Sequence, residues 1–324
     1  MRRSTCLLAL LSLGCPGDSD LLAEWIEIEG RVGFELAEDL ELGLDGVHGA
    51  WSASGELPPG VELDDDGWLR GVPEASGFYG FEAQVEDDDG RTGIVSVDLT
   101  IPTVVLLSGY EPFGGAETNP SIEALWPLQE QLAGALDLRV IELPVVWDEA
   151  WDVLLEEIDA LNPDIIVATG QAGTDRMRFE TNAVNIENGT DNDGATRSGS
   201  EVVQGGPSAL VDRLPEDVMS AAMEAEGYAT SISDDAGDYL CNHLFYHLMY
   251  YAEVEAQRTD LVAGFIHVSP AGQYSSYSVE DITAAHLLGL EALSDWYGSG
   301  AALTVRSPVD EHRAPVYFPS GGTL

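Results

Sequence analysis

The sequence predicts an α/β domain with a mostly parallel sheet and helices on both faces, preceded by a small all-β module. Between residues 25 and 102, short alternating segments are separated by Gly- and Asp-rich turns, which is typical of β-strands. After Pro102, apolar strand-like segments alternate with amphipathic helical ones, which favours a parallel sheet. The length of 324 residues is in keeping with two domains.

The first 15 residues predict an export signal. Arg2 and Arg3 precede an apolar run at 7–13 that is too short to span a bilayer. Residues 1–15 resemble a bacterial lipoprotein signal, in which Cys15 would receive the lipid; a simple export signal is the alternative. We therefore expect an exported protein of the cell envelope, periplasmic or on the cell surface, or a secreted protein if Cys15 is not lipidated.

A linker at 16–24 leads to the all-β module at 25–102. Apolar residues alternate with polar ones along 79–85 and 95–101, which predicts a hairpin with one buried face. The Pro- and Gly-containing pattern that begins at 57–64 resembles the immunoglobulin-like (cadherin-like) modules of bacterial surface proteins. That resemblance implies a β-sandwich that serves as a spacer or adhesion module. The acidic turns are interpreted as solvated, because no twelve-residue calcium loop is present.

The second domain is expected at 103–297, and the tail at 298–324 is unassigned. β-Branched apolar runs predict its strands, and apolar residues at helical spacing predict its helices. The polar, Gly-rich region 187–204 is expected to be a mobile loop. We expect strands at 104–107, 138–145, 164–169, 229–232 and 261–268, and helices at 120–132, 147–161, 215–226, 241–255 and 279–296.

Composition excludes some classes of partner. Thirteen basic residues against 58 acidic ones give a net charge of −45, which repels nucleic acid and anionic lipid head groups. Three cysteines are too few for a disulfide framework. Cys241 is the only cysteine after Cys15, so it has no disulfide partner in its own domain.

Cys241 is predicted to lie at the start of a helix. The positive end of the helix dipole and the free N–H groups there favour a thiolate and a developing oxyanion. Sites in α/β sheets lie at the carboxyl ends of strands, and the segments 109–115, 170–185 and that from His267 onward meet this condition. A buried, inert cysteine is the alternative interpretation.

Four motifs at strand ends carry a family resemblance. They are found at 107–121, 170–185, 236–242 and 264–268. In this order and spacing, residues 103–297 resemble pyroglutamyl peptidase type I, a family of cysteine peptidases. The resemblance implies a triad without a cofactor, with Cys241 as nucleophile, His267 as general base and Glu180 as the carboxylate that orients the histidine.

The resemblance also implies a pocket for the pyroglutamyl ring, formed by Tyr110, Phe113 and Gln171, with Leu240 nearby. The family usually has Phe in place of Tyr110. Many members carry an arginine after the Ala-x-Asn segment, which this sequence lacks. Either Arg176 or Arg197 substitutes for it, or the interaction is absent.

A metal site is the rival interpretation of this stretch. Cys241, His243 and His247 lie close in sequence, and the two histidines are one helical turn apart. Residues 241 and 243 point in different directions on a helix, and no fourth ligand has recognisable spacing. We therefore expect no metal.

The sequence thus predicts a cysteine exopeptidase that hydrolyses the amide bond after an N-terminal pyroglutamyl residue through an acyl-enzyme. Its partners would be pyroglutamyl peptides, with no nucleic acid, and a membrane only through a lipid anchor. The alternative is a surface-exposed peptide-binding protein with a weakly active or inactive peptidase fold. Release of a fluorophore from a pyroglutamyl amide distinguishes the two.

Overall fold

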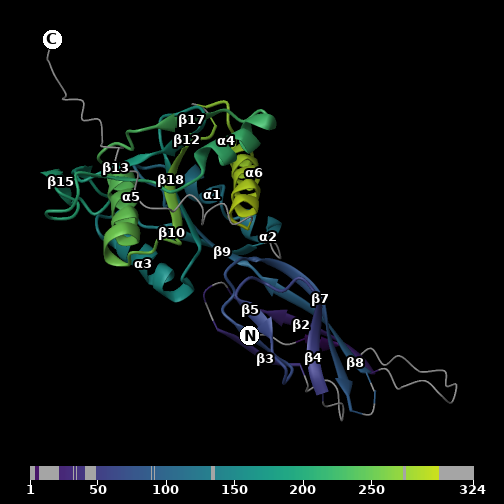
Figure 1. The fold of residues 1–324 in the computed structure, drawn as a ribbon. Coiled ribbons are helices and arrows are strands. Elements are labelled where there is room, and N and C mark those ends of the chain that lie inside the picture. Colours follow the sequence, from purple (N-terminus) through teal and green to yellow (C-terminus); the bar gives the residue numbers. More distant parts are fainter. Residues whose placement is uncertain are drawn as a thin grey trace. The chain divides into compact units, whose positions relative to one another are not determined.

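The chain forms two compact units, Met1–Thr103 and Val104–Leu324 (Figure 1). The lipid-attachment cysteine Cys15, most of the expected signal and linker, and the tail beyond Gly298 lie outside the described residues. None of the described helices has the length and apolarity needed to cross a membrane. The computed structural model describes residues 4–6, 22–31, 33, 35–40, 49–88, 90, 92–132, 136–272 and 275–298.

The described part of the first unit is all-β, as predicted. A five-stranded sheet has the order β1-β2-β8-β7-β4 and a three-stranded sheet the order β3-β6-β5. One apolar core takes side chains from both sheets, including Trp51, Phe81 and Leu69. The strands are β1 Ser4–Cys6, β2 Leu22–Glu29, β3 Leu36–Asp39, β4 Gly49–Gly55, β5 Val61–Leu63, β6 Trp68–Gly71, β7 Gly77–Asp87 and β8 Thr92–Ile101.

The predicted hairpin with one buried face is confirmed in β7 and β8. The two strands pair antiparallel, with Ala83 opposite Val95. Every second residue of β8 is buried, and the residues between them are half-buried. This period-2 pattern is the one that the alternating apolar residues indicated.

The second unit is built on a six-stranded sheet of order β10-β9-β11-β18-β12-β17. Strands β9, β11 and β18 run parallel, but β12 runs antiparallel to β18. The sheet is therefore mixed. The loop 172–176 between β11 and β12 is too short for the crossover connection that a parallel strand requires, so β12 runs antiparallel to β18. Its strands are β9 Thr103–Tyr110, β10 Leu136–Leu143, β11 Ile165–Gln171, β12 Met177–Glu180, β17 Thr230–Ser233 and β18 Val262–Val268.

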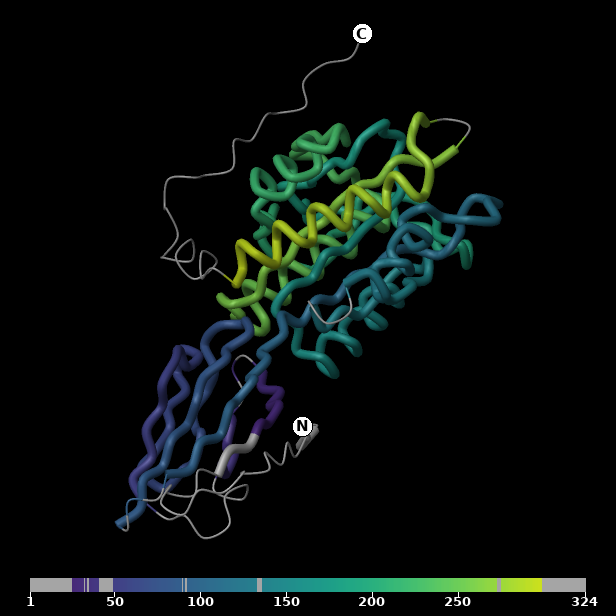
Figure 2. The backbone as a smooth tube through the Cα atoms, turned by 90° about the vertical axis from the view of Figure 1, so that its right-hand side faces the viewer, coloured from purple at the N-terminus to yellow at the C-terminus, as the bar shows by residue number. Residues whose placement is uncertain are grey.

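Helices cover both faces of this sheet, as predicted (Figure 1). In β9, Leu106 belongs to the core under α3 and α5, whereas Val105 and Leu107 belong to the core under α1, α2, α4 and α6. Figure 2 shows α6 as the long yellow helix that lies along this second face of the sheet. The helices are α1 Pro120–Glu123, α2 Leu128–Gln131, α3 Glu149–Leu161, α4 Glu216–Ala225, α5 Leu240–Tyr250 and α6 Val279–Gly298, and α5 continues into the π-helical turn η2 Tyr251–Glu255.

Two local expectations were wrong. The helix expected at 120–132 is broken into α1 and α2, because Pro127 disfavours a helical conformation in the residue before it. The loop expected at 187–204 contains a hairpin of β14 Glu187–Thr190 and β15 Thr196–Ser200. Its residues are mostly polar, so no apolar alternation indicated these strands. A second small sheet pairs β13 Asn182–Val184 with β16 Ala209–Val211.

Candidate active site

Cys241 is the second residue of α5, so its predicted position at a helix start is confirmed. Tyr239 is the N-cap residue, and its side chain makes no capping hydrogen bond. The first N–H groups of a helix have no partner within the helix. The half-buried thiol therefore lies at a helix end whose N–H groups are not capped by the Tyr239 side chain.

Adjacent strands place the predicted histidine and carboxylate side by side. His267 lies on β18 and Glu180 on β12, which pair antiparallel. Nδ1 of His267 is 2.6 Å from Oε1 of Glu180. Glu180 is fully buried and His267 is 4% exposed, so water competes little for this interaction.

The electrostatics of this pair favour an imidazolium beside a carboxylate. Burial lowers the pKa of His267, but charge interactions and hydrogen bonds with Cys241 and Glu180 outweigh burial and raise the pKa to about 9. Burial would raise the pKa of Glu180, but its hydrogen bonds with His267 and other neighbours bring this pKa below the usual value. The pKa of His267 rises and that of Glu180 falls, so both shifts favour the charged form, as expected for an ion pair.

The absence of a side chain at Gly170 leaves room for the thiol of Cys241. Gly170 lies at the end of β11, opposite His267 in the neighbouring strand. A Cβ atom at this position would be 2.7 Å from Sγ of Cys241 and 2.9 Å from the ring of Phe265. Both distances are shorter than real Cβ contacts, so no other residue fits here without displacing the sulfur or the ring.

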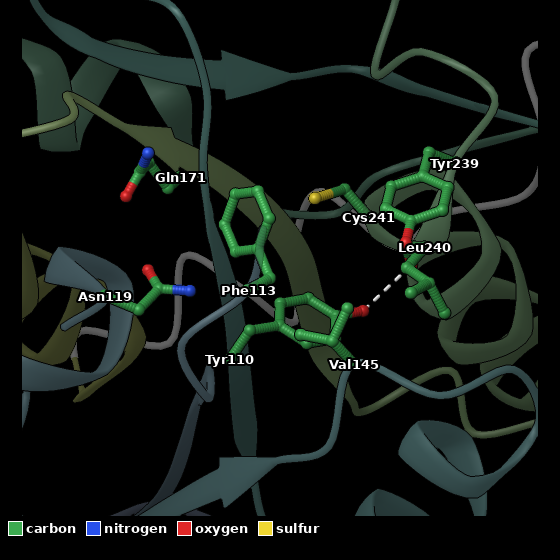
Figure 3. Close-up of a pocket in the computed structure, with 8 residues that line it drawn as sticks. All are labelled: Tyr110, Phe113, Asn119, Val145, Gln171, Tyr239, Leu240 and Cys241. Atoms are coloured by element: carbon green, nitrogen blue, oxygen red, sulfur yellow. Dashed lines mark hydrogen bonds between the residues drawn. The ribbon is translucent and has the colours of Figure 1, made fainter. Parts of the chain in front are cut away.

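Cys241 opens onto a cavity of about 110 Å³ (Figure 3). All four predicted substrate-binding residues line it, so the structure brings them together with the thiol. Three further residues of the lining were not predicted: Asn119, Val145 and Tyr239. The full lining is Tyr110, Phe113, Asn119, Val145, Gln171, Tyr239, Leu240 and Cys241.

The hydroxyl of Tyr110 makes a hydrogen bond within the protein. It donates a hydrogen bond of 2.8 Å to the carbonyl oxygen of Leu240, drawn as a dashed line in Figure 3. Tyr110 is 3% exposed, and burial raises its pKa well above the usual value. The group that distinguishes Tyr110 from phenylalanine therefore fixes the pocket wall to the start of α5.

Two of the three unpredicted lining residues make hydrogen bonds to the backbone, and the third follows a strand. Asn119 caps α1, because its side-chain oxygen accepts a hydrogen bond of 3.0 Å from the backbone N–H of Ser121. The Tyr239 hydroxyl donates to the carbonyl oxygen of Thr190 in the β14–β15 hairpin at 2.7 Å. Val145 lies just beyond β10. Among these three residues, only Asn119 had a signal in the sequence, because the Asn-Pro pair at 119–120 is typical of a helix start.

Arg178 is the charged residue near the site that sequence reasoning missed. Its Nε donates to Oε1 of Glu180 at 2.7 Å, and its Nη2 lies 3.2 Å from Nδ1 of His267. Glu180 thus binds two cationic groups through one oxygen. Neither candidate substitute for the missing arginine lines the pocket: Arg176 pairs with Asp175, and Arg197 pairs with Asp148.

Comparison with known proteins identifies relatives of the second unit. The model of the pyroglutamyl peptidase family matches residues 103–282. A pyrrolidone-carboxylate peptidase of Erwinia tasmaniensis is 36% identical over 167 residues, covering 51% of this chain and 76% of the relative. One from Bacillus cereus strain Q1 is 37% identical over 167 residues, with coverage of 51% and 77%.

Solved structures agree with these relatives. The crystal structure of pyroglutamyl peptidase I from Bacillus amyloliquefaciens is 33% identical, with a TM-score of 0.56, and the match covers 60% of this chain and 97% of that one. Pyrrolidone carboxyl peptidase from Fervidobacterium islandicum AW-1 is 28% identical, with a TM-score of 0.56 and coverage of 60% and 99%. From the family match and these relatives together, the chain belongs to the pyroglutamyl peptidase family of cysteine peptidases.

Proposed function

We propose that this chain hydrolyses the amide bond after an N-terminal pyroglutamyl residue, with Cys241 as nucleophile, His267 as general acid and base, and Glu180 as the residue that positions His267. The single observation that carries this assignment is the buried His267–Glu180 pair at 2.6 Å, next to a thiol at the start of α5. This is the arrangement of a nucleophile, a base and an orienting group.

The reaction divides into two steps. The Cys241 thiolate attacks the pyroglutamyl carbonyl carbon, and backbone N–H groups at the start of α5 stabilise the oxyanion. As the C–N bond breaks, imidazolium His267 gives its proton to the leaving amine, which leaves a thioester. Neutral His267 then takes a proton from water, whose oxygen attacks the thioester and releases pyroglutamate and the thiolate. Glu180 stabilises the imidazolium that this restores.

The chemistry of the cavity fits a small lactam. Phe113, Leu240 and the ring of Tyr110 offer apolar surface, and Gln171 is a lining residue with both amide donors and an acceptor. A lactam ring has an apolar edge and one amide, so these residues match both parts. Phe113 is 36% exposed, and in Figure 3 it lies between Cys241 and Asn119.

The test is release of a fluorophore from a pyroglutamyl amide. The matched control is the prolyl amide, which has the same ring size but lacks the ring carbonyl. We expect turnover of the first substrate only, and its loss after treatment with a thiol alkylator. Binding of a pyroglutamyl peptide without turnover would instead favour the peptide-binding alternative.

For the N-terminal region we propose an exported protein anchored by a lipid at Cys15, with an immunoglobulin-like module as spacer. The support is the signal-like sequence at 1–15 and the all-β first unit with a core shared by two sheets. Metabolic labelling with a fatty acid analogue tests the anchor. Label should appear in the wild-type membrane fraction and be lost in Cys15→Ala.

A further inference from the structure

Three side chains with metal-binding atoms converge near the start of α3. Asp148 directly precedes this helix, and His243 and His247 lie one turn apart on α5. One ligand atom from each lies within 4.8 Å of the others. The carboxylate comes from a distant part of the sequence, so the spacing of the histidines alone could not indicate the cluster.

His243 lacks the partners that a buried histidine normally has. Its side chain is 1% exposed, and neither ring nitrogen has a hydrogen-bond partner. Nε2 nevertheless faces two carboxylates, at 3.3 Å from Oδ1 of Asp148 and 3.4 Å from Oε2 of Glu187. Buried polar atoms are nearly always satisfied, so an unpartnered nitrogen aimed at carboxylates suggests a missing ligand.

These separations fit metal ligands better than hydrogen bonds. An N–H···O hydrogen bond is usually about 2.9 Å long. In a tetrahedral zinc site with bonds of about 2.0–2.1 Å, neighbouring ligand atoms are about 3.3–3.4 Å apart by simple geometry. The two distances from Nε2 of His243 match this edge length.

The surrounding charges also suit a cation, because the carboxylates of Asp148 and Glu187 both face Nε2 of His243. Arg197 donates to Oδ2 of Asp148 at 2.8 Å and leaves Oδ1 facing His243.

We propose that Asp148, His243 and His247 bind one divalent metal ion of the zinc class, with water or Glu187 at the fourth position. A set of two imidazoles and a carboxylate suits zinc. The site lies on the same helix as Cys241 but is separate from the cavity, whose lining includes none of its ligands. The bound ion joins the start of α3 to α5 and, through Glu187, reaches the β14–β15 hairpin.

In this proposal the metal ion has a structural role and no catalytic one. The hairpin holds Tyr239, a residue of the cavity wall, through the carbonyl oxygen of Thr190. Bound metal should therefore stabilise the fold around the cavity without entering the chemistry. An ion that binds only the folded state raises the melting temperature.

The test uses the full chain without an affinity tag, stripped with a chelator and titrated with Zn²⁺ by calorimetry. The ligand variants are Asp148→Asn and His247→Gln. Asn has nearly the same shape as Asp, so this substitution changes the ligand with the least disturbance of the backbone at Asp148, which has φ of 60° and ψ of −43°. Glu149→Gln is the matched control, because it removes one negative charge from the exposed neighbouring residue.

We expect one strong site in the wild type and in Glu149→Gln. Both ligand variants should bind at least about ten-fold more weakly, since loss of even an outer-shell partner costs about that much. Zn²⁺ should raise the melting temperature of the wild type and the control but not of the ligand variants. Unchanged affinity in the ligand variants, or no Zn²⁺ binding by the wild type, would overturn the proposal.

A second arm separates this site from metal capture by the catalytic thiol. Cys241→Ala should bind Zn²⁺ as the wild type does. Co²⁺ bound to the wild type should show d–d bands without a sulfur-to-cobalt charge-transfer band, because no ligand is a thiolate. Loss of the strong site in Cys241→Ala would assign it to the thiol instead, and the proposal would be wrong.

Discussion

The hydroxyl of Tyr110 binds the carbonyl oxygen of Leu240 at 2.8 Å and so joins the last residue of β9 to the first residue of α5. Both residues line the cavity, and Cys241 follows Leu240 directly. The bond therefore fixes the helix start that carries the thiol against one wall of the pocket.

Removal of this hydroxyl should impair both stability and catalysis. Tyr110→Phe keeps the ring but loses the bond, and we expect a loss of about 1 kcal/mol in the free energy of unfolding. We also expect kcat/KM to fall by roughly ten-fold, because small misplacement of a reacting group is costly. Tyr246→Phe is the matched control, since its hydroxyl bond to Pro207, at 2.7 Å, lies outside the cavity lining. Equal kcat/KM in both variants would contradict the role given to Tyr110.

Loss of the thiol should abolish covalent catalysis. We expect Cys241→Ala to lower kcat by at least roughly three orders of magnitude on a pyroglutamyl amide. The melting temperature should change little, because the smaller side chain fits beside Gly170. Near-normal kcat in a folded variant would rule out the proposed nucleophile.

The charge of His267, next to Cys241 and Glu180, should make stability depend on pH. The pKa of His267 is raised from about 6.5 in the unfolded chain to about 9 in the folded protein. Its contribution is therefore fully present below about pH 6.5 and is lost as pH rises through about 9. In His267→Gln, the free energy of unfolding should fall less between pH 7 and pH 10 than in the wild type. Parallel curves for the two proteins would mean that His267 carries no stabilising charge.

His267 should also help to keep Cys241 ionised. We expect iodoacetamide to alkylate the wild-type thiol at lower pH than the thiol of His267→Ala, because an adjacent imidazolium favours the thiolate. The measurement is the alkylation rate against pH, followed by mass spectrometry of the peptide that contains Cys241. The same pH profile in both proteins would show that the two residues are not paired, and the assignment of His267 as base would have to be abandoned.

Arg178 should act as a positioning residue for Glu180 and His267. Arg178→Gln removes the 2.7 Å bond to Glu180, and we expect kcat to fall by roughly ten-fold with KM little changed. The pH dependence of kcat should shift too, because a cation next to His267 is lost. Arg176→Gln is the matched control, since Arg176 pairs only on the surface with Asp175. Equal effects in both variants would exclude a specific role for Arg178.

The sequence was sufficient where local chemistry decides the structure. The start of α5 at Leu240 and the strand that ends with His267 and Val268 follow from apolar periodicity. The partner of His267 in space is a different matter, because Glu180 is 87 positions away. Only the resemblance to a family supplied that pairing.

Other parts of the site depend on tertiary structure that no local pattern encodes. Strand β12 enters antiparallel and places Arg178 opposite His267, which a prediction of a mostly parallel sheet could not anticipate. The β14–β15 hairpin is polar and is held partly through Tyr239, so its sequence resembles that of a loop. Asp148 approaches His243 only because α3 and α5 cover the same face of the sheet.

The bare backbone at Gly170 has a consequence for inhibition and for oxidative damage. With the backbone of Gly170 close to one side of the sulfur, an electrophile has to approach Cys241 from the cavity. An oxygen atom added to the sulfur has to point the same way, where it would occupy the space of the substrate. Selective covalent probes for this protein therefore need a reactive group that enters with a small ring, and substrate in the cavity should shield the thiol from oxidants.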